Sequence, residues 1–302
     1  MLYDIRHLTR FTYAKPAAFA RCNLRLTPID WPGQEVISHK ITVEPSGQLT
    51  AVKSQNSLAH PVRLTVTETV SSLDIVSTAQ IRVTRTVPMM LPGDPTVAAV
   101  GQAARASHDI GDLSPAAFLY PSPFIPADPA IEAWGAAFLR PDRPVLEAAL
   151  DLAQTICHTF TFDADATKTG TPPAEAFAAR AGVCQDFAQI MICALRGSGV
   201  PAAYASGYIR TTPPPGQARL QGADAMHGWV LVWCGPDDGK SGVGSGRGWI
   251  GLDPTNGIFM AGDHIIVAVG RDYLDIAPVD GIVTGSGAQD VAVEVDVEPG
   301  EG

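Results

Sequence analysis

The stretch Ala181-Gly182-Val183-Cys184-Gln185-Asp186-Phe187 places a cysteine at the start of a predicted helix. Apolar residues recur at helical spacing after it, as far as Gly197. A helix N-terminus favours a thiolate because its unpaired N–H groups and its dipole stabilise negative charge. The backbone N–H of Cys184 would also face the oxyanion of a tetrahedral intermediate. The stretch therefore predicts a nucleophilic cysteine, and a buried structural thiol is the alternative that this residue alone allows.

Two more polar residues lie at the ends of apolar strands further along the chain. His227 begins a predicted strand that runs to Trp233, and Asp253 ends the strand that starts near Gly248. Each has an ordinary structural explanation, as a core histidine or a turn aspartate. Adjacent antiparallel strands can nevertheless hold an imidazole and a carboxylate side by side. Together with Cys184, these residues are the parts of a Cys-His-Asp triad.

The composition argues against several classes of function. The chain of 302 residues carries 21 basic and 31 acidic side chains, a net charge of −10, which argues against nucleic acid or an anionic membrane as a partner. No apolar run approaches the roughly 20 residues that span a bilayer, and no signal-peptide pattern is seen. We therefore expect a cytoplasmic location. Five widely spaced cysteines without a Cys-x-x-Cys pair indicate reduced thiols rather than disulfides or a zinc site.

The chain divides into three predicted regions. Residues 1–92 alternate apolar and polar side chains, which predicts an antiparallel β-rich domain. Residues 93–140 are rich in proline and are predicted to form a connecting strap and a helix. Residues 141–302 are predicted to form an α+β catalytic core with a C-terminal strand. Three aromatic residues are expected to bind the strap to a surface: Phe118, Tyr120 and Phe124.

These segments resemble the bacterial members of the transglutaminase-like superfamily, which are often labelled as cysteine proteases. The likeness covers most of the chain. It is carried by Gly182-Val183-Cys184-Gln185-Asp186-Phe187-Ala188, Gly207-Tyr208-Ile209, His227-Gly228-Trp229-Val230, Gly248-Trp249-Ile250-Gly251-Leu252-Asp253-Pro254-Thr255-Asn256-Gly257 and residues 263–273, which include His264. The opening Tyr3-Asp4-Ile5-Arg6-His7-Leu8-Thr9 resembles the β-rich domain that accompanies this core.

The resemblance implies a papain-like core, in which the helix that carries the cysteine packs on an antiparallel sheet. It also implies that Cys184 is the nucleophile, His227 the general base and acid, and Asp253 the residue that orients the imidazole. One position departs from the family, which usually has His-Ala-Trp where this chain has Gly228. Because glycine removes no catalytic group, we expect it to affect the strand geometry rather than the activity.

The expected reaction is acyl transfer from an amide through a thioester, with a protein or peptide as the substrate. If water resolves the thioester, the protein is a protease or amidase, and if an amine does, it is a transglutaminase. The alternative is a binding or scaffold protein that retains the fold. No cofactor or metal is expected, and no loop shows the ligand spacing of a calcium site. Residues 211–224 are expected to cover the site.

Overall fold

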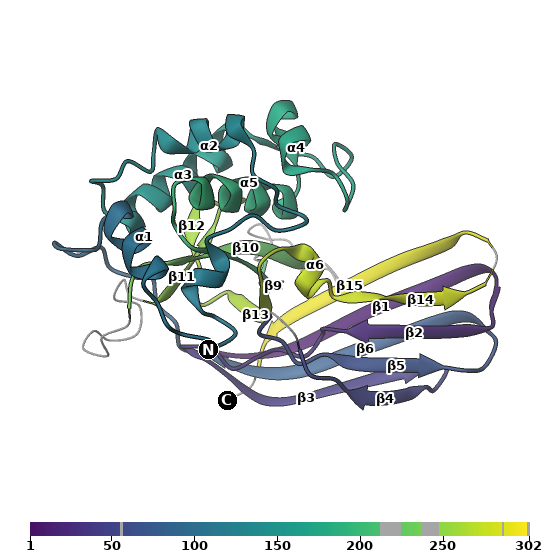
Figure 1. The fold of residues 1–302 in the computed structure, drawn as a ribbon. Coiled ribbons are helices and arrows are strands. Elements are labelled where there is room, and N and C mark those ends of the chain that lie inside the picture. Colours follow the sequence, from purple (N-terminus) through teal and green to yellow (C-terminus); the bar gives the residue numbers. More distant parts are fainter. Residues whose placement is uncertain (55–56, 212–224, 237–247, 286, 301–302) are drawn as a thin grey trace, which may run out of the picture.

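The computed structural model describes residues 1–302 except 55–56, 212–224, 237–247, 286 and 301–302. The expected cover formed by residues 211–224 therefore lies almost wholly outside the described residues. Helices gather above a five-stranded sheet at one end of the molecule, and the long strands of a β-rich domain extend from the other (Figure 1). Among the helices in the described ranges, none combines the length and the apolar character needed to span a membrane.

The β-rich domain consists of two four-stranded antiparallel sheets, with the strand orders β15-β1-β6-β3 and β14-β2-β5-β4. Alternation of apolar and polar residues produces these strands, as the sequence predicts. The first sheet contains β1 (Leu2–Ala17), β3 (Gln34–Glu44), β6 (Val70–Val83) and β15 (Gln289–Pro299). The second contains β2 (Phe19–Leu24), β4 (Gln48–Ala51), β5 (Val62–Val66) and β14 (Val279–Thr284).

The first sheet of this domain packs against two different partners along its length. At one end, Leu73 and Ile75 of β6 pack with residues of β2 and β5, including Leu24 and Leu64. At the other end, the same sheet contacts the catalytic sheet. That second cluster is formed by Tyr3, Ile5, Ala79, Ile81, Val83, Tyr208, Ile265, Val267, Val295 and Val297. The two parts of the chain therefore share an apolar interface and are not joined by a linker alone.

The catalytic sheet is antiparallel and has the strand order β12-β11-β10-β9-β13. Its strands are β9 (Ala202–Ile209), β10 (Ala225–Trp233), β11 (Trp249–Asp253), β12 (Ile258–Phe259) and β13 (His264–Gly270). A short parallel pair, β7 (Thr161–Phe162) and β8 (Ala181–Gly182), lies just before the cysteine. The helices are α1 (Val97–Arg105), α2 (Pro129–Ala136), α3 (Val145–Thr159), α4 (Pro173–Ala179), α5 (Cys184–Gly197), α6 (Tyr273–Ile276) and the 3-10 helix η1 (Pro115–Phe118).

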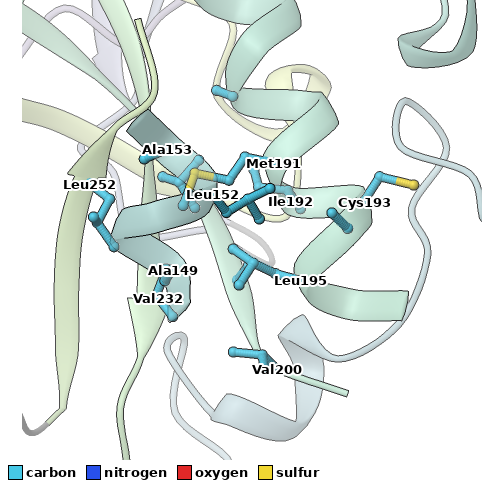
Figure 2. Packing of buried hydrophobic residues seen from close by; sticks show 14 of the residues in the cluster. Ala149, Leu152, Ala153, Met191, Ile192, Cys193, Leu195, Val200, Val232 and Leu252 are labelled. Carbon is cyan, nitrogen blue, oxygen red and sulfur yellow. The ribbon is translucent and has the colours of Figure 1, made fainter. Parts of the chain in front are cut away.

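Helix α5 is the centre of the catalytic core. Its residues from Asp186 to Arg196 are all buried, because the helix packs on strands β9 and β10 and is also contacted by α2, α3 and α4. Figure 2 shows Leu152 of α3 and Met191 of α5 meeting Val232 of β10 in one apolar cluster. The helix is thus fixed along its length, so its N-terminal residue has a fixed position. The predicted α+β class, with a nucleophile helix on an antiparallel sheet, is confirmed.

The predicted strap contains more regular structure than its prolines suggested. Helix α1, which the sequence did not predict, begins where the Thr96 side chain accepts a hydrogen bond from the N–H of Ala99, at 3.2 Å. Phe118 packs edge-on against Trp249, with ring centroids 5.1 Å apart. Phe124 stacks on Tyr273, at 6.2 Å, whereas Tyr120 is 63% exposed. Two of the three aromatic side chains therefore bind the segment as expected.

The end of the chain does not stay with the catalytic core, in contrast to the predicted region 141–302. Strand β14 pairs with β2, and β15 pairs with β1 from Tyr3 opposite Pro299 to Tyr13 opposite Gln289. The period of two predicted the last strand, but periodicity carries no information about which strand is its neighbour. Residues 279–299 thus complete both sheets of the β-rich domain.

This pairing makes the stability of the protein depend on the buried part of β15. Val297 is fully buried at the interface with the catalytic sheet, whereas Val291 on the same strand is 51% exposed. We expect Val297→Ala to lower the free energy of unfolding by about 2 kcal/mol, and Val291→Ala by less than about 0.5 kcal/mol. Urea unfolding followed by circular dichroism measures both. Equal losses would contradict the placement of β15.

Candidate active site

The first turn of α5 is built around Asp186. Its Oδ2 accepts hydrogen bonds from the N–H of Val183, at 2.9 Å, and from the Thr167 hydroxyl, at 2.6 Å. Asp186 thus caps the helix start. A Cβ on Gly182 would lie only 2.6 Å from this oxygen, so the turn requires glycine. Cys184 is consequently the first residue of the helix, where backbone N–H groups lack partners within the helix.

The structure brings His227 and Asp253 together. Strands β10 and β11 are paired with Val230 opposite Leu252, which places the two side chains on neighbouring strands. His227 Nε2 lies 2.8 Å from Asp253 Oδ2, and both side chains are buried. An ionised carboxylate only accepts, so Nε2 donates this hydrogen bond. Nδ1 is left for the thiol.

The imidazole is held in its charged form. Burial by itself would lower the pKa of His227, but hydrogen bonds to Asp253 and Cys184 and the charges of both groups outweigh it and raise the pKa to about 10. The same contacts hold the pKa of Asp253 well below its usual value, against the opposing effect of its burial. At neutral pH the pair is therefore an imidazolium and a carboxylate. Cys184, which is partly exposed, lies next to that positive charge.

The other four cysteines have environments of the opposite kind. Burial raises the pKa of each of these thiols, and that of Cys193 reaches about 11. In Figure 2 the Cys193 side chain points away from the apolar cluster, and its sulfur lies 3.5 Å from the carbonyl oxygen of Pro126. Cys184 is therefore the cysteine whose surroundings favour a thiolate.

Asp253 is both the turn residue and the partner of the imidazole, so the two interpretations of its sequence position hold at once. Its Oδ1 accepts the backbone N–H groups of Thr255 and Asn256, at 2.9 and 3.3 Å. Its Oδ2 accepts the Asn256 side-chain amide at 2.6 Å, in addition to His227. The carboxylate plane is fixed by this turn, and its Oδ2 lone pairs point to β10.

A further histidine contacts the same carboxylate. His264, the first residue of β13, lies with Nε2 3.1 Å from Asp253 Oδ2 and is buried. Its Nδ1 faces the N–H of Ala261, at 3.5 Å, so Nε2 carries the proton and donates to Asp253. The sequence analysis placed His264 in a family-typical segment without a role. The signal for it is the same as for His227, a histidine at the start of an uninterrupted apolar strand.

His227, Asp253 and His264 each offer a ligand atom, and these atoms lie within 4.8 Å of one another. A tetrahedral zinc ion bound at about 2.0–2.2 Å would hold its ligand atoms more than 3 Å apart. Here one oxygen lies 2.8 and 3.1 Å from the two ring nitrogens, which are hydrogen-bond contacts. We therefore assign the three side chains to a hydrogen-bond network and not to a metal centre.

Gly228 has a specific structural reason. A Cβ at this position would lie 2.1 Å from the hydroxyl oxygen of Tyr204, and 2.8 Å from its Cζ. Tyr204 comes from the neighbouring strand β9, opposite Val230, and is buried. The tyrosine hydroxyl therefore occupies the space that a methyl group at residue 228 would take, and the strand remains regular.

The comparisons with known proteins agree with this architecture. Residues 132–254 match the model of the transglutaminase-like superfamily, and residues 3–82 match that of the bacterial transglutaminase-like N-terminal region. An uncharacterized protein of Mycobacterium tuberculosis is 34% identical over 99% of this chain and 93% of its own length. This chain belongs to the transglutaminase-like superfamily. The resemblance on which the sequence analysis relied is confirmed.

Two further matches show how far this transglutaminase-like architecture extends. An uncharacterized protein of Mycobacterium leprae is 27% identical over 96% of each chain. A solved structure from Cytophaga hutchinsonii, described as a "putative cysteine protease", covers 100% of this chain and 92% of its own with a TM-score of 0.73 and 19% identity. The second match shows the fold, with the β-rich domain and the transglutaminase-like core arranged in one chain.

The contact between residues 204 and 228 can be tested directly. We expect Gly228→Ala to destabilise the protein by about 1–3 kcal/mol, because the added methyl group meets a buried ring that has no room to move. Tyr204→Phe in the same chain is expected to recover part of that loss, since it removes the nearest atom. Thermal unfolding of the two single variants and the double variant measures the coupling. Additive losses would show that the hydroxyl is not the obstacle.

The raised pKa of His227 predicts a pH profile. Because an imidazolium stabilises the adjacent thiolate, Cys184 is expected to react with iodoacetamide well below the ordinary thiol pKa of about 8.5. The ion pair persists until the imidazolium loses its proton, near pH 10. In His227→Ala the reaction is expected to follow an ordinary thiol titration. Peptide mass spectrometry separates Cys184 from the other four cysteines, and equal profiles for the variant and the wild type would refute the pairing.

Proposed function

We propose that this protein is a cysteine enzyme that transfers the acyl group of an amide through a thioester at Cys184. The observation that carries the proposal is the His227 imidazole. One of its nitrogens donates a hydrogen bond to the buried carboxylate of Asp253. The ring also interacts, through a hydrogen bond and through its charge, with Cys184, the first residue of α5. This arrangement supports a thiolate, a proton donor and a fixed orientation for that donor.

The steps follow from these positions. The Cys184 thiolate attacks the carboxamide carbon, and the carbonyl electrons move onto oxygen, close to the unpaired N–H groups of the first turn of α5. The intermediate collapses as the C–N bond breaks, and the His227 imidazolium gives its proton to the departing nitrogen. A thioester remains, and the now neutral imidazole takes a proton from the second nucleophile as it attacks the thioester carbon. The C–S bond then breaks, the acyl product leaves, and the Cys184 thiolate and the imidazolium are restored.

The identity of the second nucleophile separates two reactions. Water gives hydrolysis, and an amine gives transamidation. We propose hydrolysis of a peptide or protein amide as the primary activity, and the similar structure from Cytophaga hutchinsonii, described as a "putative cysteine protease", supports this choice. Transamidation of a protein glutamine is the second candidate, and the family of this chain supports it. All five cysteines are free thiols, which supports the cytoplasm as the site of action.

Both reactions can be followed with one substrate. Dimethylated casein is incubated with a biotin-labelled alkylamine, and new peptide termini, released ammonia and bound biotin are measured separately. Cys184→Ala is expected to lower every signal by about 10³-fold or more, because no other group supplies the nucleophile. Cys193→Ala serves as a matched control on the same helix and is expected to retain the wild-type rate. EDTA is expected to have no effect.

The outcomes divide cleanly. New termini without biotin identify a protease, ammonia without biotin identifies a glutaminase-type amidase, and bound biotin identifies a transglutaminase. If Cys184→Ala retains the full activity on casein, the thioester mechanism is wrong. If the wild type gives none of the three signals and its Cys184 reacts with iodoacetamide no faster than an ordinary thiol, the protein is a binding or scaffold protein that retains the fold.

A further inference from the structure

The Asp253 carboxylate has a second imidazole partner that the triad itself does not require. His227 and His264 donate to the same oxygen from two different strands, at 2.8 and 3.1 Å. The side chain of Trp229 packs against both histidines, with ring centroids 5.9 Å from His227 and 5.3 Å from His264. The Trp229 Nε1–H is itself directed at the sulfur of Met260, at 3.2 Å. His264 therefore shares two contacts, Asp253 and Trp229, with His227.

The segment that carries His264 is held by the β-rich domain. Arg85, just after β6, donates from Nη1 to the carbonyl oxygens of Ala261 and His264, at 3.2 and 3.0 Å. The hydroxyl of Tyr3 donates to Asp263 Oδ1 at 2.9 Å. The backbone on both sides of the histidine is thus bound by side chains that are more than 170 positions away in sequence.

Gln34 completes the hold two residues further along. Its side-chain amide donates to the carbonyl oxygens of Ile29 and Ile266, at 2.7 and 2.8 Å, and its Oε1 accepts the N–H of Ile266 at 2.9 Å. The side chain is buried, and it hydrogen-bonds both backbone groups of Ile266 as a neighbouring strand would. Arg85 also approaches Gln34 Oε1, at 3.4 Å. The two side chains form one connected clamp.

We propose that His264 is a positioning residue for Asp253, and that the β-rich domain contributes to the reaction by holding His264 in place through Arg85 and Gln34. His264 touches neither the thiol nor the substrate carbon. It acts through the carboxylate, which must stay in the plane that lets His227 keep Nδ1 on the thiol. The inference rests on the proposed function, because it assigns support for that same triad.

Other groups near this network do not replace His264. Asp263 precedes it and is bound to Tyr3 and to Arg210, which lies 3.6 Å away. The buried guanidinium of Arg85 contacts backbone carbonyls on this segment. In the part of the chain that the structure describes, Asp253 Oδ2 also accepts from Asn256, in the same turn, and from His227, on β10. His264 is thus the contact that ties Asp253 to β13 and, beyond it, to the β-rich domain.

The first test measures the alkylation rate of Cys184 by iodoacetamide at about pH 6, where an ordinary thiol is nearly unreactive. We expect His264→Phe, which keeps a ring beside Trp229 but removes the donor, to lower this rate by about tenfold. His264→Gln, whose amide can replace Nε2–H, is expected to remain within about threefold of the wild type. His264→Asn has a side chain too short to reach Asp253, and it takes the place of His264→Phe if that variant does not fold.

A matched control separates positioning from loss of stability. His7 is also buried, and its two ring nitrogens contact the hydroxyl groups of Tyr208 and Thr9, at 3.1 and 3.0 Å, and not Asp253. His7→Phe is expected to lower the melting temperature and leave the Cys184 rate at acid pH unchanged. On a substrate amide, His264→Phe is expected to lower kcat with little change in KM.

The second test asks whether the β-rich domain acts through His264. Arg85→Met is expected to slow Cys184 alkylation in the wild-type background by about threefold or more and to have no further effect in His264→Phe, because the two changes lie on one path. Arg82→Met, three residues earlier, on β6 and in an exposed pair with Glu35, is the control. If Arg85→Met does not fold, Gln34→Met takes its place.

Each outcome decides something. A fast wild-type thiol with an unchanged His264→Phe variant overturns the positioning role and leaves the proposed function standing. Equal effects of Arg85→Met in both backgrounds overturn the link to the β-rich domain. A wild-type thiol that reacts no faster than the other four cysteines overturns the proposed function and this inference with it.

Discussion

The buried carboxylate of Asp253 is the constraint on which the structure depends. Asp253 is fully buried, and an ionised group in such a place is tolerated only if the protein supplies the hydrogen bonds that water would give. The chain supplies them from three directions: the turn that follows β11, the imidazole on β10 and the imidazole on β13. Strand order, the 253–257 turn and the placement of two histidines are all consistent with this one requirement.

The same constraint explains why the reactive end of the site can stay partly exposed. The thiol lies at the start of a helix that is buried from its first turn onward. The Asp253 carboxylate stabilises the positive charge of the imidazole beside that thiol. Rigid elements thus carry each of the three groups, and Cys184 is the group that stays partly exposed. The β-rich domain adds to this rigidity, because its first sheet packs on the catalytic sheet through Tyr3, Ile81 and Val297.

Local patterns predicted the parts that depend on neighbouring residues in sequence. The helix start at Cys184 and the strands that carry His227 and Asp253 follow from period and spacing, and the structure brings His227 and Asp253 together. What sequence did not yield depends on partners far away. The pairing of β15 with β1, the contact of His264 with Asp253 and the space that Tyr204 takes above Gly228 each join residues that no local pattern connects. Their catalytic roles stay predictions until the variants are measured.

The order of the strands has a consequence for how the protein is made. β6 ends at Val83 and β14 begins at Val279. The whole catalytic region is therefore inserted between two strands of the β-rich domain. A ribosome therefore releases the cysteine, both histidines and the aspartate before it synthesises the strand that closes the first sheet against β1. A nascent chain that stops after β13 contains every group of the site and lacks the last two strands of its support. Translation must run to the C-terminus before the reactive centre has its complete scaffold.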